Sequence, residues 1–247
     1  MSTETPVIKQ SYQRILLKLS GEMLMQGQAF GINPESCQAL ANYIKHLHAA
    51  GLEIGIVIGG GNIFRGRHLE AIGIARSPAD QMGMLATLIN GVALQEALEN
   101  IGCKTKVLTS LDCPKVAESY TWRAAIEALK SKTVVIFVGG TGNPYFTTDT
   151  AAALRASEIR ADILLKATKV DGIYSKDPLK YPDALRYPSL SYSEMLAKKL
   201  EVMDATAVAL CRSNNIPVLV FDMQKLASKN IAQLLYQPGF GSLISGE

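Results

Sequence analysis

Residues 14–22 read RILLKLSGE, an apolar run that ends in a serine and a glycine. Two later stretches follow the same plan, EIGIVIGGGN at 53–62 and TVVIFVGGTGN at 133–143. Short apolar runs bounded by glycine are typical of strands that are buried on both faces of a parallel sheet. The three stretches therefore predict strands that each end in a glycine-rich loop, and they indicate an α/β fold.

Helical patterns separate these strands. Asn33 and Pro34 form an N-cap followed by proline at the first helical position, and this helix is expected to end at Gly51. A longer helix is expected from Pro78 to Asn100. Further strands are expected at 104–109, 163–166, 217–221 and 242–244, and further helices at 120–130, 148–160, 191–200, 205–214 and 225–236. The alternation predicts a mostly parallel central sheet with helices on both faces.

The segment 171–190 breaks this alternation, because it holds three prolines and several turn residues. We interpret it as an excursion with a short hairpin beside the sheet. No repeat or linker interrupts the rest of the sequence. We therefore expect one domain over 1–247, with an extension at 1–13, an acceptor-side lobe over about 14–165 and a nucleotide-side lobe over about 166–247.

Composition narrows the class of protein. The 247 residues are 48% hydrophobic and carry a formal net charge of +3 without long charged runs, which argues against a nucleic-acid binder or a membrane-surface protein. The N-terminus lacks the apolar region of a signal peptide, and no apolar run is long enough to span a bilayer, so a cytoplasmic protein is expected. The four cysteines form no C-x-x-C pair, which favours free thiols and no metal site.

The glycine loops suggest a phosphate site, because glycine lets backbone N–H groups approach an anion closely. The stretch GNIFRGRH at 61–68 lacks the lysine and hydroxyl of a P-loop, and Phe64 stands where a dinucleotide fingerprint needs its third glycine. Three such loops at the carboxyl edge of one sheet could hold a polyphosphate. The alternative is that the glycines only turn the chain.

Several charged residues accompany these loops. Lys18 lies near the end of an apolar strand, where it either reaches solvent or meets an anion, and Arg65 and Lys166 are further candidates for contacting phosphoryl oxygens. Asp149 follows Thr148 at a helix start, where compensation of the helix dipole would be a sufficient role.

Two more residues allow two interpretations each. Asp80 ends Ser77-Pro-Ala-Asp, which also fits a capping box. Tyr174 could stack on a base or pack on its own hairpin.

Together these motifs resemble the bacterial uridylate kinases of the amino acid kinase fold family. The resemblance covers nearly the whole chain. It rests on KLSGE, VIGGGNIFRG, DQMGMLAT, TGNPYFTTDTAA, KATKVDGIYSKDP, LSYSEML and VMDATA. The GGGN loop is shared across the wider family, whereas TGNPYFTTD and KATKVDGIY are far more specific.

The resemblance implies an α/β/α sandwich that transfers a phosphoryl group from ATP, with Mg²⁺, to UMP in pyrimidine nucleotide synthesis. Lys18 and Arg65 would stabilise the transferring group, and Asp149 would orient the lysine. The implied ATP contacts are Lys18, Leu19, Ser20, Gly21, Gly61, Arg65, Lys166, Thr168, Tyr174 and Asp177. The implied UMP contacts are Gly60, Asp80, Thr141, Gly142, Asn143, Pro144, Tyr145, Phe146, Thr147 and Thr148.

The resemblance also implies a homohexamer with allosteric regulation, inhibited by UTP and in many members activated by GTP. One loop departs from the family pattern: it reads QGQAFG at 26–31, where Ala29 replaces a glycine, so activation by GTP stays open. Two alternatives remain. A carbamate or amino-acid carboxylate kinase would share the fold but not TGNPYFTT, and an anion or nucleotide storage protein should lack Lys18.

Overall fold

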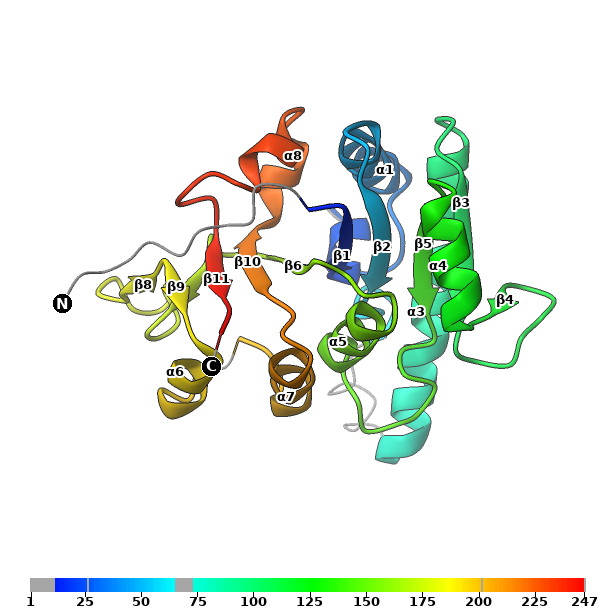
Figure 1. Cartoon of the computed structure of the whole chain (residues 1–247). Coiled ribbons are helices and arrows are strands. Elements are labelled where there is room, and N and C mark those ends of the chain that lie inside the picture. Colours follow the sequence, from blue (N-terminus) through cyan, green and yellow to red (C-terminus); the bar gives the residue numbers. More distant parts are fainter. Residues whose placement is uncertain (1–11, 26, 65–72, 201, 247) are drawn as a thin grey trace.

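The computed structural model describes residues 12–25, 27–64, 73–200 and 202–246. These residues form a nine-stranded sheet with the strand order β4-β3-β5-β2-β1-β6-β10-β11-β9, which runs from right to left in Figure 1. Every pairing is parallel except the one between β10 and β11. The predicted mostly parallel sheet is therefore confirmed.

The strands follow the apolar runs of the sequence. They are β1 (Arg14–Leu19), β2 (Glu53–Ile58), β3 (Thr105–Thr109), β4 (Glu118–Ser119), β5 (Val134–Val138), β6 (Ile163–Thr168), β9 (Ser189–Leu190), β10 (Val218–Asp222) and β11 (Ser242–Ile244). A separate hairpin pairs β7 (Ile173–Tyr174) with β8 (Arg186–Tyr187), as expected for the proline-rich excursion. All six residues of β2 and all five of β5 are buried, as central strands of a parallel sheet should be.

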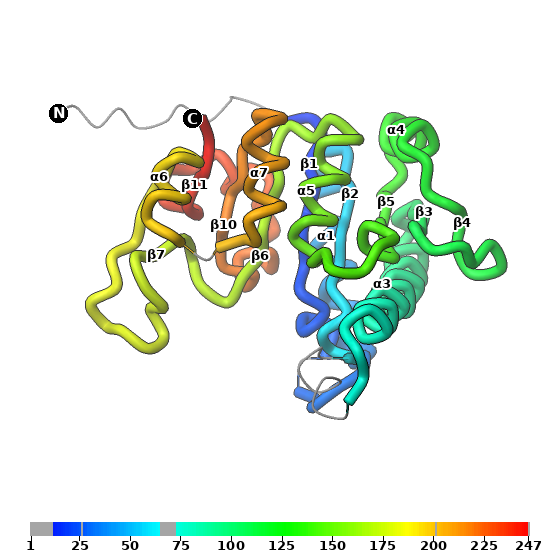
Figure 2. The backbone as a smooth tube through the Cα atoms, turned by 90° about the horizontal axis from the view of Figure 1, so that it is seen from below, coloured from blue at the N-terminus to red at the C-terminus, as the bar shows by residue number. Residues whose placement is uncertain are grey.

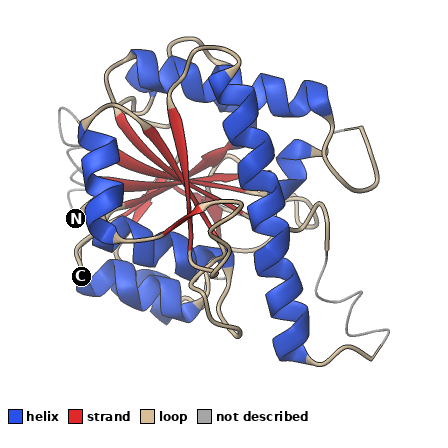
Figure 3. Ribbon diagram, turned by 90° about the vertical axis from the view of Figure 1, so that its right-hand side faces the viewer, coloured by secondary structure: helices blue, strands red, loops and turns tan. Residues whose placement is uncertain are grey.

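Helices cover both faces of the sheet. One face carries α1 (Pro34–Ala49), α3 (Arg76–Glu99) and α8 (Ile231–Leu234), whose apolar side chains pack with Ile15, Leu17 and Leu19 of β1. The other face carries α4 (Trp122–Lys130), α5 (Thr148–Glu158), α6 (Tyr192–Ala197) and α7 (Ala205–Ser213), which pack with Leu16. Figure 3 shows the strands fanning out between these layers of helices. The three-layer sandwich is confirmed.

Several local signals are confirmed in detail. The Asn33 side chain accepts a hydrogen bond from the Ser36 N–H, and Gly51 after the helix has a φ of +87°. Ser191 and Glu194 form the predicted capping box of α6. That helix ends at Ala197 rather than near Leu200, and Lys199 beyond it has a φ of +51°.

One predicted helix is wrong. The pattern at 225–236 predicts one helix, but the structure has a 3₁₀ helix, η2 (Met223–Ala227), and then the short α8. The Asp222 carboxylate caps η2 early by accepting from the Gln224 N–H, and Ser228 takes an extended conformation that breaks the run. Side-chain capping outweighs the helical periodicity here.

Candidate functional site

A buried cluster of charge lies at the carboxyl edge of the sheet, where β1 and β6 run side by side. Lys18 of β1 and Lys166 of β6 are register partners, so both side chains reach the same place. Asp149, in the first turn of α5, lies between them. Its Oδ1 is 3.0 Å from Lys18 Nζ and its Oδ2 is 2.5 Å from Lys166 Nζ. We call these three residues the charge cluster.

Burial and charge act against each other inside this cluster. Burial raises the pKa of the Asp149 carboxyl, but the ammonium groups of Lys18 and Lys166 outweigh burial and hold that pKa below its ordinary value. Burial lowers the pKa of Lys166, an effect that Asp149 opposes and Lys18 reinforces. Because two cations face one carboxylate, the cluster can attract a further anion such as a phosphate.

The backbone fixes Asp149 in place. Thr147 is the N-cap of α5, and its hydroxyl oxygen accepts from the N–H groups of Asp149 and Thr150. The Thr147 hydroxyl in turn donates to Asp204, and the Thr150 hydroxyl donates to the other oxygen of that carboxylate at 2.7 Å. Figure 2 shows α5 and α7 side by side. Asp204 is the N-cap of α7. Asp204 therefore couples the two helices beside the cluster, a role that sequence reasoning did not find.

The predicted donor loop follows β1 directly. Ser20 caps η1 (Gly21–Leu24), a 3₁₀ turn, by accepting from the Glu22 N–H. A side chain at position 21 would collide with Asn62 and with the Gly59 carbonyl, so glycine is required for these loops to pack together. Leu19, another predicted ATP contact, is fully buried.

The GGGN loop is held by two buried asparagines. Asn90 of α3 donates to the Gly59 carbonyl at 2.8 Å and to Asn62 Oδ1 at 2.7 Å. Asn62 donates in return to Asn90 Oδ1 at 2.9 Å and to the Gly31 carbonyl. Gly60 packs against Ala86 of α3, whereas a side chain at Gly61 would meet open space. Asn90 was missed by the sequence reasoning, because a single buried asparagine in a helix carries no motif.

A pocket of about 270 Å³ opens on one side of the charge cluster, beyond β2 and β5. We call it the acceptor pocket. Seven of the predicted UMP contacts line it: Gly60, Asp80, Thr141, Asn143, Phe146, Thr147 and Thr148. Gly61, predicted on the ATP side, also lines it. Gly142, Pro144 and Tyr145 belong to the same loop but are not among the described residues of its wall.

Asp80 holds the loop beside this pocket by a hydrogen bond to the loop backbone. Its Oδ2 accepts from the Tyr145 N–H and from Arg76 Nε, both at 2.8 Å. Tyr145 has a φ of +73°, which is rare for a residue other than glycine. The alternative role of Asp80 in a capping box is wrong: α3 begins at Arg76, its N-cap is Ala75, and no side-chain cap is present. The carboxylate bonds to the loop and to the Arg76 side chain, and it does not cap the first turn of α3.

A second pocket, of about 460 Å³, lies beyond β6 and β10. We call it the donor pocket. Three predicted ATP contacts line it: Thr168, Tyr174 and Asp177. The Tyr174 hydroxyl donates to Asp171 Oδ1 at 2.6 Å, which ties the ring to its own hairpin. In the sheet order, the charge cluster on β1 and β6 lies between the acceptor pocket and the donor pocket.

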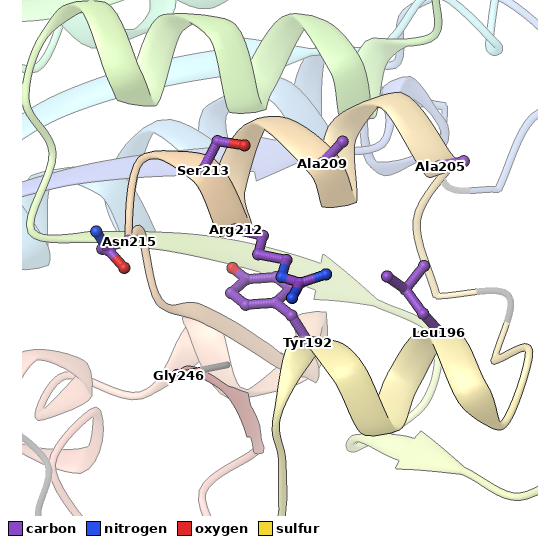
Figure 4. A pocket seen from close by; sticks show the side chains of 8 residues that line it. All are labelled: Tyr192, Leu196, Ala205, Ala209, Arg212, Ser213, Asn215 and Gly246. Atoms are coloured by element: carbon purple, nitrogen blue, oxygen red, sulfur yellow. The ribbon is translucent and has the colours of Figure 1, made fainter.

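Another hollow lies away from the predicted site. It has a volume of about 470 Å³, lies between α6, α7 and the C-terminal segment, and is lined by Tyr192, Arg212 and their neighbours, but by none of the predicted site residues within the described chain (Figure 4).

Arg65, predicted to contact ATP, and Gln26 lie outside the described residues.

The match to a family model decides the family. Residues 13–222 match the model of the amino acid kinase family. The chain belongs to that family.

Individual relatives agree with this assignment. A uridylate kinase of Protochlamydia amoebophila (strain UWE25) is 59% identical over 232 residues, which cover 94% of this chain and 92% of that protein. A uridylate kinase of Roseobacter denitrificans (strain ATCC 33942 / OCh 114) is 47% identical over 98% of this chain and 96% of its own length. The crystal structure of UMP kinase from Ureaplasma parvum, 39% identical, superimposes with a TM-score of 0.89 over 96% of this chain and all of that one. The resemblance to the uridylate kinases is thereby confirmed.

Proposed function

We propose that this chain transfers the terminal phosphoryl group of ATP to UMP, giving ADP and UDP. The observation that carries the proposal is the charge cluster, two lysines around one aspartate, between two pockets at the carboxyl edge of the sheet. Such an arrangement suits a reaction in which phosphate oxygens from two sides meet over positive charge. The uridylate kinases named above support UMP as the acceptor.

In the proposed reaction an oxygen of the UMP phosphate attacks the terminal phosphorus of ATP. The bond from that phosphorus to the bridging oxygen breaks, and ADP leaves with the electron pair. Lys18 and Lys166 would stabilise the charge on the transferring oxygens, and Asp149 would hold both ammonium groups in place. The UMP phosphate is already an anion near neutral pH, so no general base is needed.

We propose Mg²⁺ as the metal that accompanies ATP. The described residues contain no group of three or more His, Cys, Asp or Glu side chains that could hold a metal by themselves. The Asp149 carboxylate fits Mg²⁺, which is commonly held by substrate phosphates and water with one or two carboxylates. When bound, Mg²⁺ would neutralise charge on the phosphate oxygens, and Asp149 would be its candidate protein ligand in the cluster.

A panel of nucleoside monophosphates tests the substrate. Purified protein with ATP and Mg²⁺ is expected to convert UMP to UDP and to use CMP, AMP and GMP poorly, because the acceptor pocket has the TGNPYFTT loop as its wall. Equal turnover of UMP and CMP would overturn the assignment. Tight nucleotide binding without turnover would favour the storage protein, and turnover of a carbamate or an amino acid alone would favour the carboxylate kinase.

Assembly and regulation are further parts of the proposal. We infer a homohexamer from the resemblance to the uridylate kinases. A stripe of exposed apolar residues on α3 supports self-association: Leu85, Ile89 and Val92 are 50%, 51% and 40% exposed and share one helix face. UTP would inhibit the enzyme, since its uridine resembles that of UMP. GTP activation stays open. The two lobes, about 14–165 and 166–247, would carry the acceptor pocket and the donor pocket respectively.

The proposed place of action is the cytoplasm, where both nucleotide substrates occur. Within the described residues, no helix has the length and apolarity needed to cross a membrane.

A further inference from the structure

Arg155 is a buried arginine in the last turn of α5, on the same helix as Asp149. Only 4% of it is exposed, and most of the other buried residues of α5 are alanines. A guanidinium removed from water destabilises the fold unless its charge and its N–H groups find partners. The partners of Arg155 therefore indicate why an arginine stands here.

One arm of the guanidinium, Nη1, contacts a carboxylate, which compensates the positive charge. Arg155 Nη1 donates to Glu158 Oε2 at 2.5 Å, and the guanidinium carbon lies 3.8 Å from the centre of the Tyr120 ring. The Tyr120 hydroxyl donates to the same Glu158 oxygen at 2.5 Å. These contacts join α5 to the segment that follows β4.

The other arm reaches the acceptor loop. Arg155 Nη2 donates to Ser110 Oγ at 2.7 Å and to the Gly140 carbonyl at 3.3 Å. The Ser110 hydroxyl donates to that same carbonyl at 3.2 Å. A single backbone carbonyl thus receives hydrogen bonds from two side chains, each far away in the sequence.

The carbonyl belongs to the turn that opens the loop. Gly139, Gly140 and Gly142 have φ values of +76°, +58° and +83°. Because glycine can adopt many backbone conformations, the glycines alone do not hold this turn in one of them. Gly140 lines the acceptor pocket together with Thr141 and Asn143. A shift of the Gly140 carbonyl would therefore move the pocket wall directly.

We propose that Arg155, acting through Ser110 and the Gly140 carbonyl, is a positioning residue that holds the acceptor loop in the conformation that binds UMP. This inference rests on the proposed function. Arg155 itself does not line the acceptor pocket, so it acts through the loop and not on the substrate. Glu158 and Tyr120 would be sufficient partners for an arginine that only stabilised the core. The second arm, directed to the loop, is the part that points to binding.

Steady-state kinetics of four variants test this role. Arg155→Lys keeps the charge but loses the two-armed geometry, Arg155→Met loses both, and Ser110→Ala removes only the bridging hydroxyl. Arg160→Lys, at an exposed position just after α5, is the matched control. We expect KM for UMP to rise about tenfold in Ser110→Ala and Arg155→Lys and further in Arg155→Met, while KM for ATP changes less than about twofold. The control should match the wild type.

A double variant sharpens the test. Because Ser110 and Arg155 bond each other and one carbonyl, Ser110→Ala combined with Arg155→Lys should raise KM for UMP by less than the product of the two single effects. Equal rises in KM for UMP and ATP, or lower thermal stability with unchanged KM for UMP, would overturn the positioning role. Lack of UMP turnover in the wild type would reject the proposed function instead. Ser110→Ala keeps the test valid if Arg155→Met does not fold.

Discussion

The charge cluster and the acceptor loop lie at the same edge of the sheet but are positioned in different ways. Lys18 and Lys166 stand on adjacent central strands, and the parallel register alone places their side chains together. The acceptor loop, Gly139–Thr148, has several residues with positive φ and is held by side chains from other elements. The comparison teaches that regular secondary structure can position charged side chains by itself, whereas a substrate-binding loop needs hydrogen bonds from side chains of other elements to hold its conformation.

The anchors of the acceptor loop come from two helices. Asp80 of α3 holds the Tyr145 N–H, Thr87 of α3 accepts from the Gly139 N–H at 2.8 Å, and Arg155 of α5 holds the Gly140 carbonyl. Changes in the charge cluster should therefore affect the chemical step, and changes at the anchors should affect acceptor binding. The larger effects are expected in the charge cluster and the smaller ones at the anchors.

Lys18→Ala should have the largest effect. Removing a positive charge from the transferring phosphoryl group should lower kcat by roughly 10²–10³-fold, while the Kd for UMP stays within about threefold. Rapid-quench kinetics and calorimetric UMP binding measure the two quantities. Lys106→Ala is the matched control, because Lys106 is also a strand lysine paired with a carboxylate, Glu118, but lies 38% exposed on β3. Collapse of UMP affinity with near-normal kcat would contradict the assignment.

Asp149→Asn should lower kcat by roughly 10²-fold and reduce the free energy of unfolding by about 3 kcal/mol, because two partly buried ammonium groups lose their carboxylate. Since the folded-state pKa of Asp149 lies below its ordinary value, this stabilisation is complete above that value and is lost as pH falls through the depressed pKa.

Denaturant unfolding at several pH values checks both parts of the Asp149 prediction. The stability difference between the wild type and Asp149→Asn should be largest near neutral pH and should shrink between about pH 5 and pH 2. A difference that stayed constant over this range would mean that the carboxylate charge does not stabilise the cluster.

Asp80→Asn should act on the acceptor side with a smaller effect. The amide can keep one acceptor oxygen for the Tyr145 N–H but loses the charge that pairs with Arg76. We expect KM for UMP to rise about fivefold to tenfold, with kcat and KM for ATP within about twofold. If kcat fell as far as in Lys18→Ala, the separation between chemistry and acceptor binding would not hold.

Much of the fold could be predicted because it depends on local signals. The central strands are continuous apolar runs, and caps such as Asn33 and Ser191 mark helix starts with side chains that the sequence displays. The failure at 225–236 has a local cause of another kind, because the Asp222 cap starts a 3₁₀ helix before the periodic pattern begins and the extended Ser228 then breaks the run. Periodicity predicts which face is apolar, but capping decides where a helix begins.

The site was predictable only in part. Lys18 could be found as a charge inside an apolar strand, and the glycine loops as phosphate motifs. Asn90, Asp204 and Arg155 carry no such signal, because each acts on a loop or helix that is distant in sequence. Their roles follow from the three-dimensional packing of α3, α5 and α7 around the sheet edge.

Tyr174→Phe should have the smallest effect, and it tests whether the donor pocket uses the ring or the hydroxyl. The hydroxyl already donates to Asp171 and is the main cause that holds the Asp171 pKa below its ordinary value; burial opposes this effect and Arg186 adds to it. We expect KM for ATP to stay within about twofold and the Asp171 pKa to rise toward its ordinary value in an NMR titration. Tyr174→Ala, which also removes the ring, should raise KM for ATP several-fold. If Phe and Ala raised KM for ATP equally, the hydroxyl would have to contact the nucleotide, and the donor pocket would then depend on a side-chain anchor as the acceptor loop does.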